Sequence, residues 1–178
     1  MNSDIDIKIA GDKPSKDIKK NLEAQNKVSY DKAVISGAKA WGKAVALKFI
    51  EDANTAAAED SNLEMLIQRR MLLSFTATVG FEQFCSDDTL IGMAQKSFLD
   101  TLKTANPELY RTSGDTGAFS FYYLAFRRGS EVDRRIGQTF AMLCSHDGDP
   151  IYQELGEALY CWFLSVVKKA AKENGILV

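Results

Sequence analysis

Signals that begin and end helices recur along this chain, and they constrain its fold more than any other feature. Asn106-Pro107 and Asp149-Pro150 each place a capping side chain before a proline, which is tolerated in the first turn of a helix. Ser61-Asn62-Leu63-Glu64 has the spacing of a capping box, and Ser86 precedes two aspartates that suit the positive end of a helix. Gly129 follows two arginines, as is typical of a helix end. The chain is therefore divided into segments of helical length.

Apolar residues between these boundaries recur with a helical period. One series has a spacing of four residues and comprises Leu63, Ile67, Met71, Phe75 and Val79. A second series comprises Ile151, Leu155, Leu159, Trp162 and Val166. Boundaries and periodicity together predict an all-α fold, a single helical-bundle-like domain of about six helices. We expect these helices over residues 30–58, 62–85, 88–105, 116–128, 131–146 and 150–174, with a turn or short helix over 107–112 and a further short helix over 15–27.

The N-terminal segment has a different pattern. Residues 4–9, with the sequence Asp-Ile-Asp-Ile-Lys-Ile, alternate polar and apolar side chains as a strand does, and Gly11 and Pro14 then interrupt the pattern. A single strand has no partner within an all-helical domain. We therefore expect a flexible arm over residues 1–15, or a strand there that pairs with another chain, followed by one all-helical domain over residues 16–178.

The charge balance disfavours two classes of partner. The 178 residues include 22 Lys and Arg against 24 Asp and Glu, which gives a formal net charge of −2. Proteins that bind mainly to DNA phosphates or to an acidic membrane surface carry an excess of positive charge, so we do not expect nucleic acid as a partner. The single histidine, His146, excludes sites that need several histidines, such as an HExxH zinc site. No motif predicts a metal or another cofactor.

The cysteines and the apolar segments indicate a cytoplasmic protein. Cys85, Cys144 and Cys161 are odd in number and lie within apolar segments, so we expect reduced, buried thiols rather than a disulfide framework. The first fifteen residues carry several charges and no apolar core of a signal peptide. The longest charge-free apolar segments, 71–81 and 158–167, are shorter than the roughly 20 residues that span a bilayer, so we expect no membrane insertion.

The densest aromatic run lies between residues 119 and 126. It contains Phe119, Phe121, Tyr122, Tyr123 and Phe126. Apolar side chains on every face predict either a central core helix or a helix shared with a partner. We favour the central core helix and keep two alternatives, a dimer interface and the wall of an apolar ligand pocket. Trp162 would line the same pocket, and Tyr122 and Tyr123 would supply its polar groups.

Four arginines lie within nine residues on both sides of Gly129, namely Arg127, Arg128, Arg134 and Arg135. They form the one basic concentration in an acidic chain, and such a patch could bind a phosphate, a nucleic-acid backbone or an acidic partner. Glu131 and Asp133 lie between them. We therefore favour the simpler interpretation, in which the arginines are helix-terminal charges with intramolecular ion pairs.

Two polar segments are interpreted as structural turns rather than sites. The turn at residues 113–117 contains two glycines and two hydroxyl groups, but it lacks the lysine of a P-loop, and Asp115 would repel a phosphate. Cys144 and His146 are two residues apart at a helix end, so their side chains diverge by about 200° and do not form a local catalytic pair. No catalytic residues can be named, which favours a protein that is not an enzyme, although residues distant in sequence can converge in a fold.

Small residues recur on the segment 30–58 and predict close helix packing there. They are Ser36, Ala40 and Ala44, one turn apart, together with Ala33 and Gly37. Trp41 on the same segment is expected in the core.

The function favoured by these features is protein–protein interaction, with self-association into a homodimer or another homo-oligomer as its first form. Three segments are apolar on nearly all faces, namely 71–84, 119–126 and 158–167, and not every one can be central in a domain of this size. The tail at residues 176–178 is a further contact for a partner. The alternatives are a small-molecule sensor with an apolar pocket between helices and a phosphate or nucleic-acid contact through the arginines.

Overall fold

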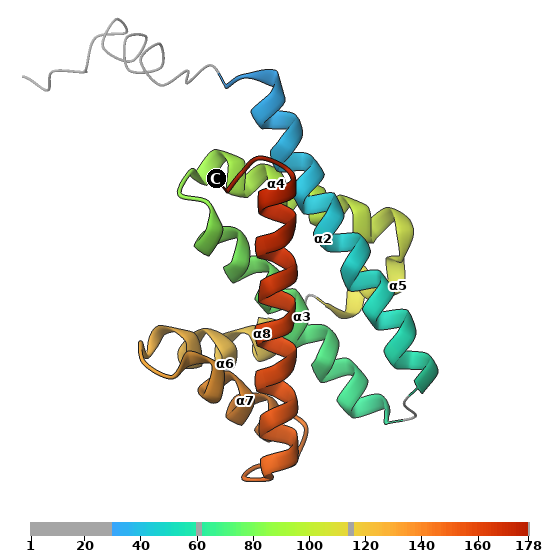
Figure 1. Ribbon diagram of the computed structural model, residues 1–178. Helices are drawn as coiled ribbons and strands as arrows, with labels where there is room; N and C mark the ends of the chain where they lie inside the picture. The colour runs from blue at the N-terminus through green and yellow to red at the C-terminus, as the bar shows by residue number, and fades with distance from the viewer. Residues whose placement is uncertain (1–29, 60–61, 114–115, 178) are drawn as a thin grey trace, which may run out of the picture. The chain divides into compact units, whose positions relative to one another are not determined.

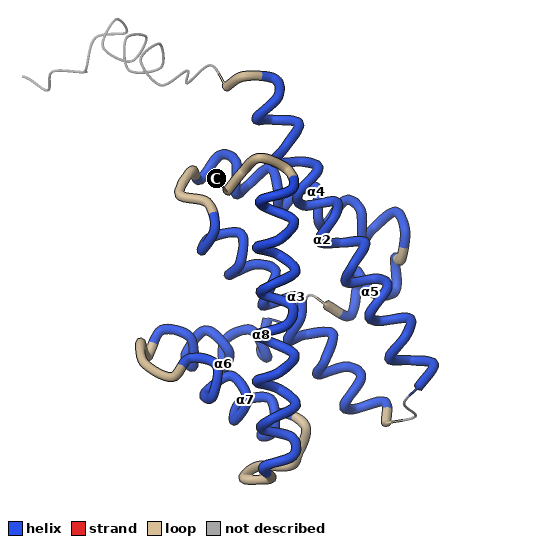
Figure 2. Tube along the Cα trace, viewed as in Figure 1, coloured by secondary structure: helices blue, strands red, loops and turns tan. Residues whose placement is uncertain are grey.

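The computed structural model describes residues 30–59, 62–113 and 116–177. These residues form seven α-helices joined by short loops, and no strand occurs among them (Figure 2). The helices are α2 (Lys32–Glu59), α3 (Leu63–Phe84), α4 (Asp88–Ala105), α5 (Pro107–Thr112), α6 (Thr116–Arg127), α7 (Val132–Leu143) and α8 (Pro150–Glu173). The predicted all-α class is confirmed. The predicted arm at 1–15 and helix at 15–27 lie outside the described residues.

Side chains cap four of these helices, at the predicted residue in α5 and α8 and one residue after the predicted serine in α3 and α4. The Asp87 carboxylate accepts hydrogen bonds from the backbone N–H groups of Thr89 and Leu90, at 2.9 and 3.1 Å. Asn106 and Asp149 cap α5 and α8 in the same way, each before a proline. The cap of α3 is Asn62, one residue later than the capping-box spacing predicts, and its amide oxygen accepts from the N–H of Met65.

The central helix is α3. The sequence did not decide which of three apolar segments is central. From Met71 to Phe81 every residue except Thr78 is buried. Figure 1 shows why: α8, in red, crosses α3, while α2 and α4 lie on one side and α6 and α7 on the other. Because α3 contacts helices on several sides, an apolar side chain is stabilised on almost every face of this helix.

The favoured prediction for the aromatic run, a central core helix, is wrong. In α6 one face is buried, with Tyr122 fully buried and Ala125 5% exposed, while Phe121 is 48% and Leu124 59% exposed. The helix packs on α3 and α7 along one face. The outer face of α6 therefore exposes apolar side chains, and packing within the domain does not explain why they are apolar.

The second apolar series predicts the buried face of α8 only in part. The buried side chains of α8 include Leu159, Tyr160, Phe163 and Val167, whereas two members of the series, Ile151 and Trp162, are 73% and 42% exposed. The buried face is set by close contact with α7, where a Cβ on Gly156 would lie 2.5 Å from the Cβ of Phe140. Cys161 is exposed as well, and Cys85 is only partly buried, so the prediction of buried thiols holds for Cys144 alone.

The C-terminal residues fold back onto the domain. Ile176 and Leu177 are half-buried against the core, and the backbone N–H groups of both donate to the carbonyl oxygen of Ala171, at 2.9 and 3.3 Å. These two residues are therefore not the free contact for a partner that the sequence suggested.

Candidate functional site

The outer face of α6 and the adjoining face of α7 form an apolar surface with basic residues at its edge, here called the α6–α7 surface. Three apolar side chains lie in it, Phe121, Leu124 and Met142, and the last is 40% exposed. They line a hollow of about 390 Å³ together with Arg128 and Arg135. Asp147, in the loop after α7, supplies one carboxylate to the same hollow.

Leu124 also borders a second hollow, on the α3 side of α6. This hollow measures about 520 Å³, and Glu82, Ser120, Tyr123 and Arg127 line it as well. Burial raises the pKa of the Tyr123 hydroxyl, the Glu82 carboxylate adds to the rise, and Arg127 opposes it. Tyr123 is therefore a neutral hydrogen-bonding group here at neutral pH. Leu124 stands on a ridge between the two hollows.

Most of the aromatic run holds α6 onto α3. Four of its rings surround Phe75 of α3 with centroid distances between 5.1 and 6.2 Å, namely Phe119, Tyr122, Tyr123 and Phe126. Burial raises the pKa of the Tyr122 hydroxyl strongly, and this group has no hydrogen-bond partner among the described residues. Tyr122 is thus a core residue, not an accessible polar group in a pocket. Of the five aromatic residues predicted as a site, Phe121 is the one that faces outward.

The four arginines do not form one patch. Arg128 and Arg135 line the hollow beside α7, whereas Arg127 lines the hollow beside α3. Arg134 is exposed and forms an ion pair with Glu131 at 3.5 Å, which agrees with the simpler interpretation for that residue. Arg135 donates to Ser130 Oγ at 3.5 Å, and its Nη1 is buried with no hydrogen-bond partner in the described structure.

Trp162 lies in a different place from the outer face of α6. It lines a hollow of about 230 Å³ with Leu155 and Leu159 of its own helix and with Asp52 and Arg69. The sequence suggested one apolar pocket that joins Trp162 to the aromatic run, but the structure places Phe121 and Trp162 in separate hollows.

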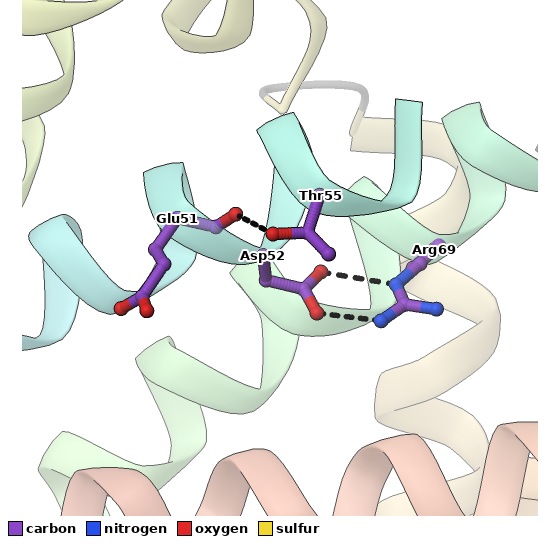
Figure 3. Close-up of polar contacts among 4 residues, drawn as sticks. All are labelled: Glu51, Asp52, Thr55 and Arg69. Atoms are coloured by element: carbon purple, nitrogen blue, oxygen red, sulfur yellow. Dashed lines mark hydrogen bonds and ion pairs between the residues drawn. The ribbon is translucent and has the colours of Figure 1, made fainter. Parts of the chain in front are cut away.

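Figure 3 shows a two-pronged ion pair between Asp52 of α2 and Arg69 of α3, two residues that line the same hollow as Trp162. Arg69 donates from Nε to one carboxylate oxygen of Asp52 at 3.0 Å and from Nη2 to the other at 2.5 Å. The Asp52 side chain is only 8% exposed. Asp52 accepts from the Nε and Nη2 edge of the guanidinium, so this ion pair joins α2 to α3.

Replacing Arg69 with methionine is expected to lower the free energy of unfolding by about 2 kcal/mol, because Asp52 would remain buried without its partner. Urea unfolding followed by circular dichroism measures the change. The matched control is Arg134→Met, which breaks an ion pair whose side chains are 65% and 63% exposed and is expected to cost less than about 0.5 kcal/mol. Equal effects of the two substitutions would contradict a structural role for the Asp52–Arg69 pair.

The sequence predicts that the segment after α7 is a structural turn rather than a site, and the structure shows how its side chains pack. Cys144 is 3% exposed, and burial, with the Glu64 carboxylate adding to it, raises the pKa of its thiol to about 12. A thiol with this pKa is protonated at neutral pH and is a poor nucleophile. The His146 ring stacks on Tyr152 at 3.8 Å, and Ser145 Oγ donates to a carboxylate oxygen of Glu64 at 2.9 Å.

The α2–α4 groove is a surface that sequence reasoning missed. Its volume is about 660 Å³, and three lysines line it, Lys39 and Lys43 on α2 and Lys96 on α4. These helices are joined by Ser97, whose Oγ donates to the carbonyl oxygen of Lys39 at 2.7 Å. Lys96 lies more than fifty residues from Lys39 and Lys43 in the chain, so no local pattern indicates that the three lysines meet.

Neither a metal site nor a membrane-spanning helix is found in the part of the chain that the structure describes. No three His, Cys, Asp or Glu side chains gather there as metal ligands would. None of its helices has the length and apolar composition needed to cross a bilayer.

Comparison with known proteins gives no relative of this chain. No protein family matches it, and no curated protein or solved structure is significantly similar to it.

Proposed function

We propose that this protein is a non-enzymatic interaction module that associates through the α6–α7 surface, in the first instance with a second copy of itself. The observation that supports this proposal is the exposure of Phe121 and Leu124 on the outer face of α6, beside a partly exposed Met142 on α7. Adjoining apolar side chains at a surface, edged by charged groups, are typical of a protein contact. Arginine and aromatic residues are also enriched among the side chains that dominate binding energy.

The shape of the surface favours a second copy as the partner. Leu124 stands between two hollows, so this face presents a ridge next to depressions. When two identical faces meet across a two-fold axis, the ridge of each can enter a hollow of the other. Each hollow also contains one carboxylate, from Asp147 or Glu82, which can pair with arginines from the second copy.

The cytoplasm is the location that we propose for this function. All three cysteines lie in the described part of the chain and form no disulfide there, and Cys161 is exposed. An exposed thiol persists most readily in a reducing compartment.

A single substitution on the ridge is expected to weaken self-association by about 100-fold. Leu124→Glu places a charge at the centre of the contact in both copies, and each copy loses about tenfold in affinity. Native mass spectrometry and sedimentation of the full-length chain over a range of concentrations measure the change. The control is Leu99→Glu on α4, where the replaced leucine is 45% exposed and lies outside the surface.

The expected results are a dimer for the unchanged chain and for Leu99→Glu, and a monomer for Leu124→Glu. An unchanged chain that stays monomeric at high concentration would contradict the self-association. The same spectra test the small-molecule alternative, because a retained ligand would appear as a defined additional mass.

The phosphate contact is a second candidate with one observation in its favour. Arg128 and Arg135 share the hollow beside α7, and one guanidinium nitrogen of Arg135 is buried there without a hydrogen-bond partner among the described residues. We rank it below self-association because three apolar side chains line or adjoin the same hollow, and these gain little from a phosphate.

A further inference from the structure

We propose that the α2–α4 groove binds an acidic amphipathic helix of a partner protein. This site lies on helices other than those of the α6–α7 surface and does not depend on self-association. Three properties of the groove carry the proposal: its length, the apolar side chains in its lining and its excess of positive charge.

The groove has the length of a short helix. Its α2 wall is formed by Lys39, Lys43 and Leu47, which are one turn apart and span about 12 Å along the axis. Its α4 wall extends from Met93 to Ala105, about 18 Å. The two walls are held close together, because the carbonyl oxygen of Ala94 approaches Gly42 and Ser97 bonds to the backbone of α2. A rigid channel of this size can receive two to three turns of a third helix.

The lining of the groove is partly apolar and partly charged. Leu47, which is 50% exposed, and Met93 supply apolar surface. Lys39, Lys43 and Lys96 line the groove with a single carboxylate, Asp100, so the local charge is about +2 in a chain whose net charge is −2. None of the three lysines has an ion pair within the described ranges, whereas Lys48 and Lys169 nearby each pair with a glutamate.

These properties favour one class of ligand. A helix with leucine-like side chains on one face and carboxylates beside them would cover Leu47 and Met93 and pair with the lysines at once. A nucleic-acid strand would pair with the lysines but would leave Leu47 and Met93 against its phosphates, which is unfavourable. Exposed lysine–carboxylate pairs contribute modestly each, so we expect moderate affinity that falls as salt is added.

The test uses a synthetic fluorescein-labelled peptide of about 18 residues, with leucine at helical i, i+3, i+4 and i+7 positions and glutamate at most others. Fluorescence anisotropy measures its binding to the full-length chain at low and at moderate salt. The test variant is Lys39→Glu with Lys43→Glu, and the matched control is Lys168→Glu with Lys172→Glu. Both are pairs of exposed lysines one turn apart on a helix, with the same change of charge. Circular dichroism checks that each variant is folded.

The unchanged chain and the control are expected to bind the peptide in a saturable, salt-dependent manner, and the test variant at least about tenfold more weakly. A counterpart peptide with lysine in place of glutamate should not bind. An equal loss of peptide affinity in the test variant and the control variant, or no saturable binding of the peptide to the unchanged chain at low salt, would overturn the proposal. Binding of anionic lipid vesicles in preference to the peptide would also overturn it, because the ligand would then be a membrane. Repeating the titration with Leu124→Glu separates this site from self-association, since that substitution should leave peptide binding unchanged.

Discussion

Gly42→Ala is expected to lower the free energy of unfolding by about 3 kcal/mol, a large effect for the addition of one methyl group. A Cβ at this position would lie 2.0 Å from the carbonyl oxygen of Ala94, and the backbone of α4 cannot avoid it by a side-chain rotation. The two helices must move apart instead. That movement loosens the buried contacts between them, such as the stacked rings of Phe49 and Phe98 at 6.0 Å.

The control for this prediction is Gly92→Ala on α4. Nothing lies within 4 Å of a Cβ built at Gly92, and the residue is exposed. Alanine is a better helix former than glycine, so this variant is expected to be more stable by about 0.5 to 1 kcal/mol. Urea unfolding monitored by circular dichroism gives both changes with their signs. If the two variants changed stability in the same direction, the close approach of α2 to α4 at Gly42 would be refuted.

Trp41→Ala is expected to cost about 4 kcal/mol. The indole is fully buried, its Nε1 donates to the carbonyl oxygen of Val167 at 2.9 Å, and its ring meets Phe81 edge-on at 4.8 Å. The substitution leaves a cavity where α2, α3 and α8 meet and removes the hydrogen bond from the indole to a backbone carbonyl in the interior. Trp41→Phe retains most of the volume but not the hydrogen bond, so an intermediate loss is expected.

The second tryptophan provides the comparison. Trp162 is 42% exposed on α8, and Trp162→Ala is expected to cost less than about 1 kcal/mol. In that variant Trp41 is the only indole, and its fluorescence should be protected from quenching by iodide until the chain unfolds. An equal loss of stability for Trp41→Ala and Trp162→Ala, or rapid quenching of Trp41 in the folded protein, would show that the burial assigned to these residues is wrong.

The helices were predictable because the signals that define them are local. A capping residue such as Asp87 and its bonded N–H groups lie within three residues of each other, so the sequence around them contains both partners. The same holds for Asp149 before Pro150. Where such a signal was ambiguous, as at Asn62, the predicted boundary moved by only one residue.

The face that each helix buries was less predictable. The segment 158–167 of α8 is free of charge, so a stripe through Trp162 and a stripe through Phe163 fit the periodicity equally well. The close approach at Gly156 selected the second. Sequence reasoning singled out small residues on α2. Ser36 and Ala40 are exposed, whereas Gly37 does lie at a close approach, and so does Gly42, which the sequence did not single out.

The candidate surfaces depended most strongly on tertiary structure. Phe121 and Leu124 lie on a different face of α6 from Tyr122. Which face is buried depends on where α3 packs against α6. The lysines of the α2–α4 groove come together because two distant helices pack side by side. The spacing of neighbouring residues in the sequence predicts neither arrangement.

The sequence alone therefore determined the all-α class of this protein and the approximate beginning and end of each described helix, because capping and periodicity act between residues a few positions apart. Only the tertiary structure decided that α3 is the central helix, that α6 exposes Phe121 and Leu124, and that lysines gather between α2 and α4. These outcomes depend on which helices approach each other and how closely, and that is a property of the packed domain as a whole.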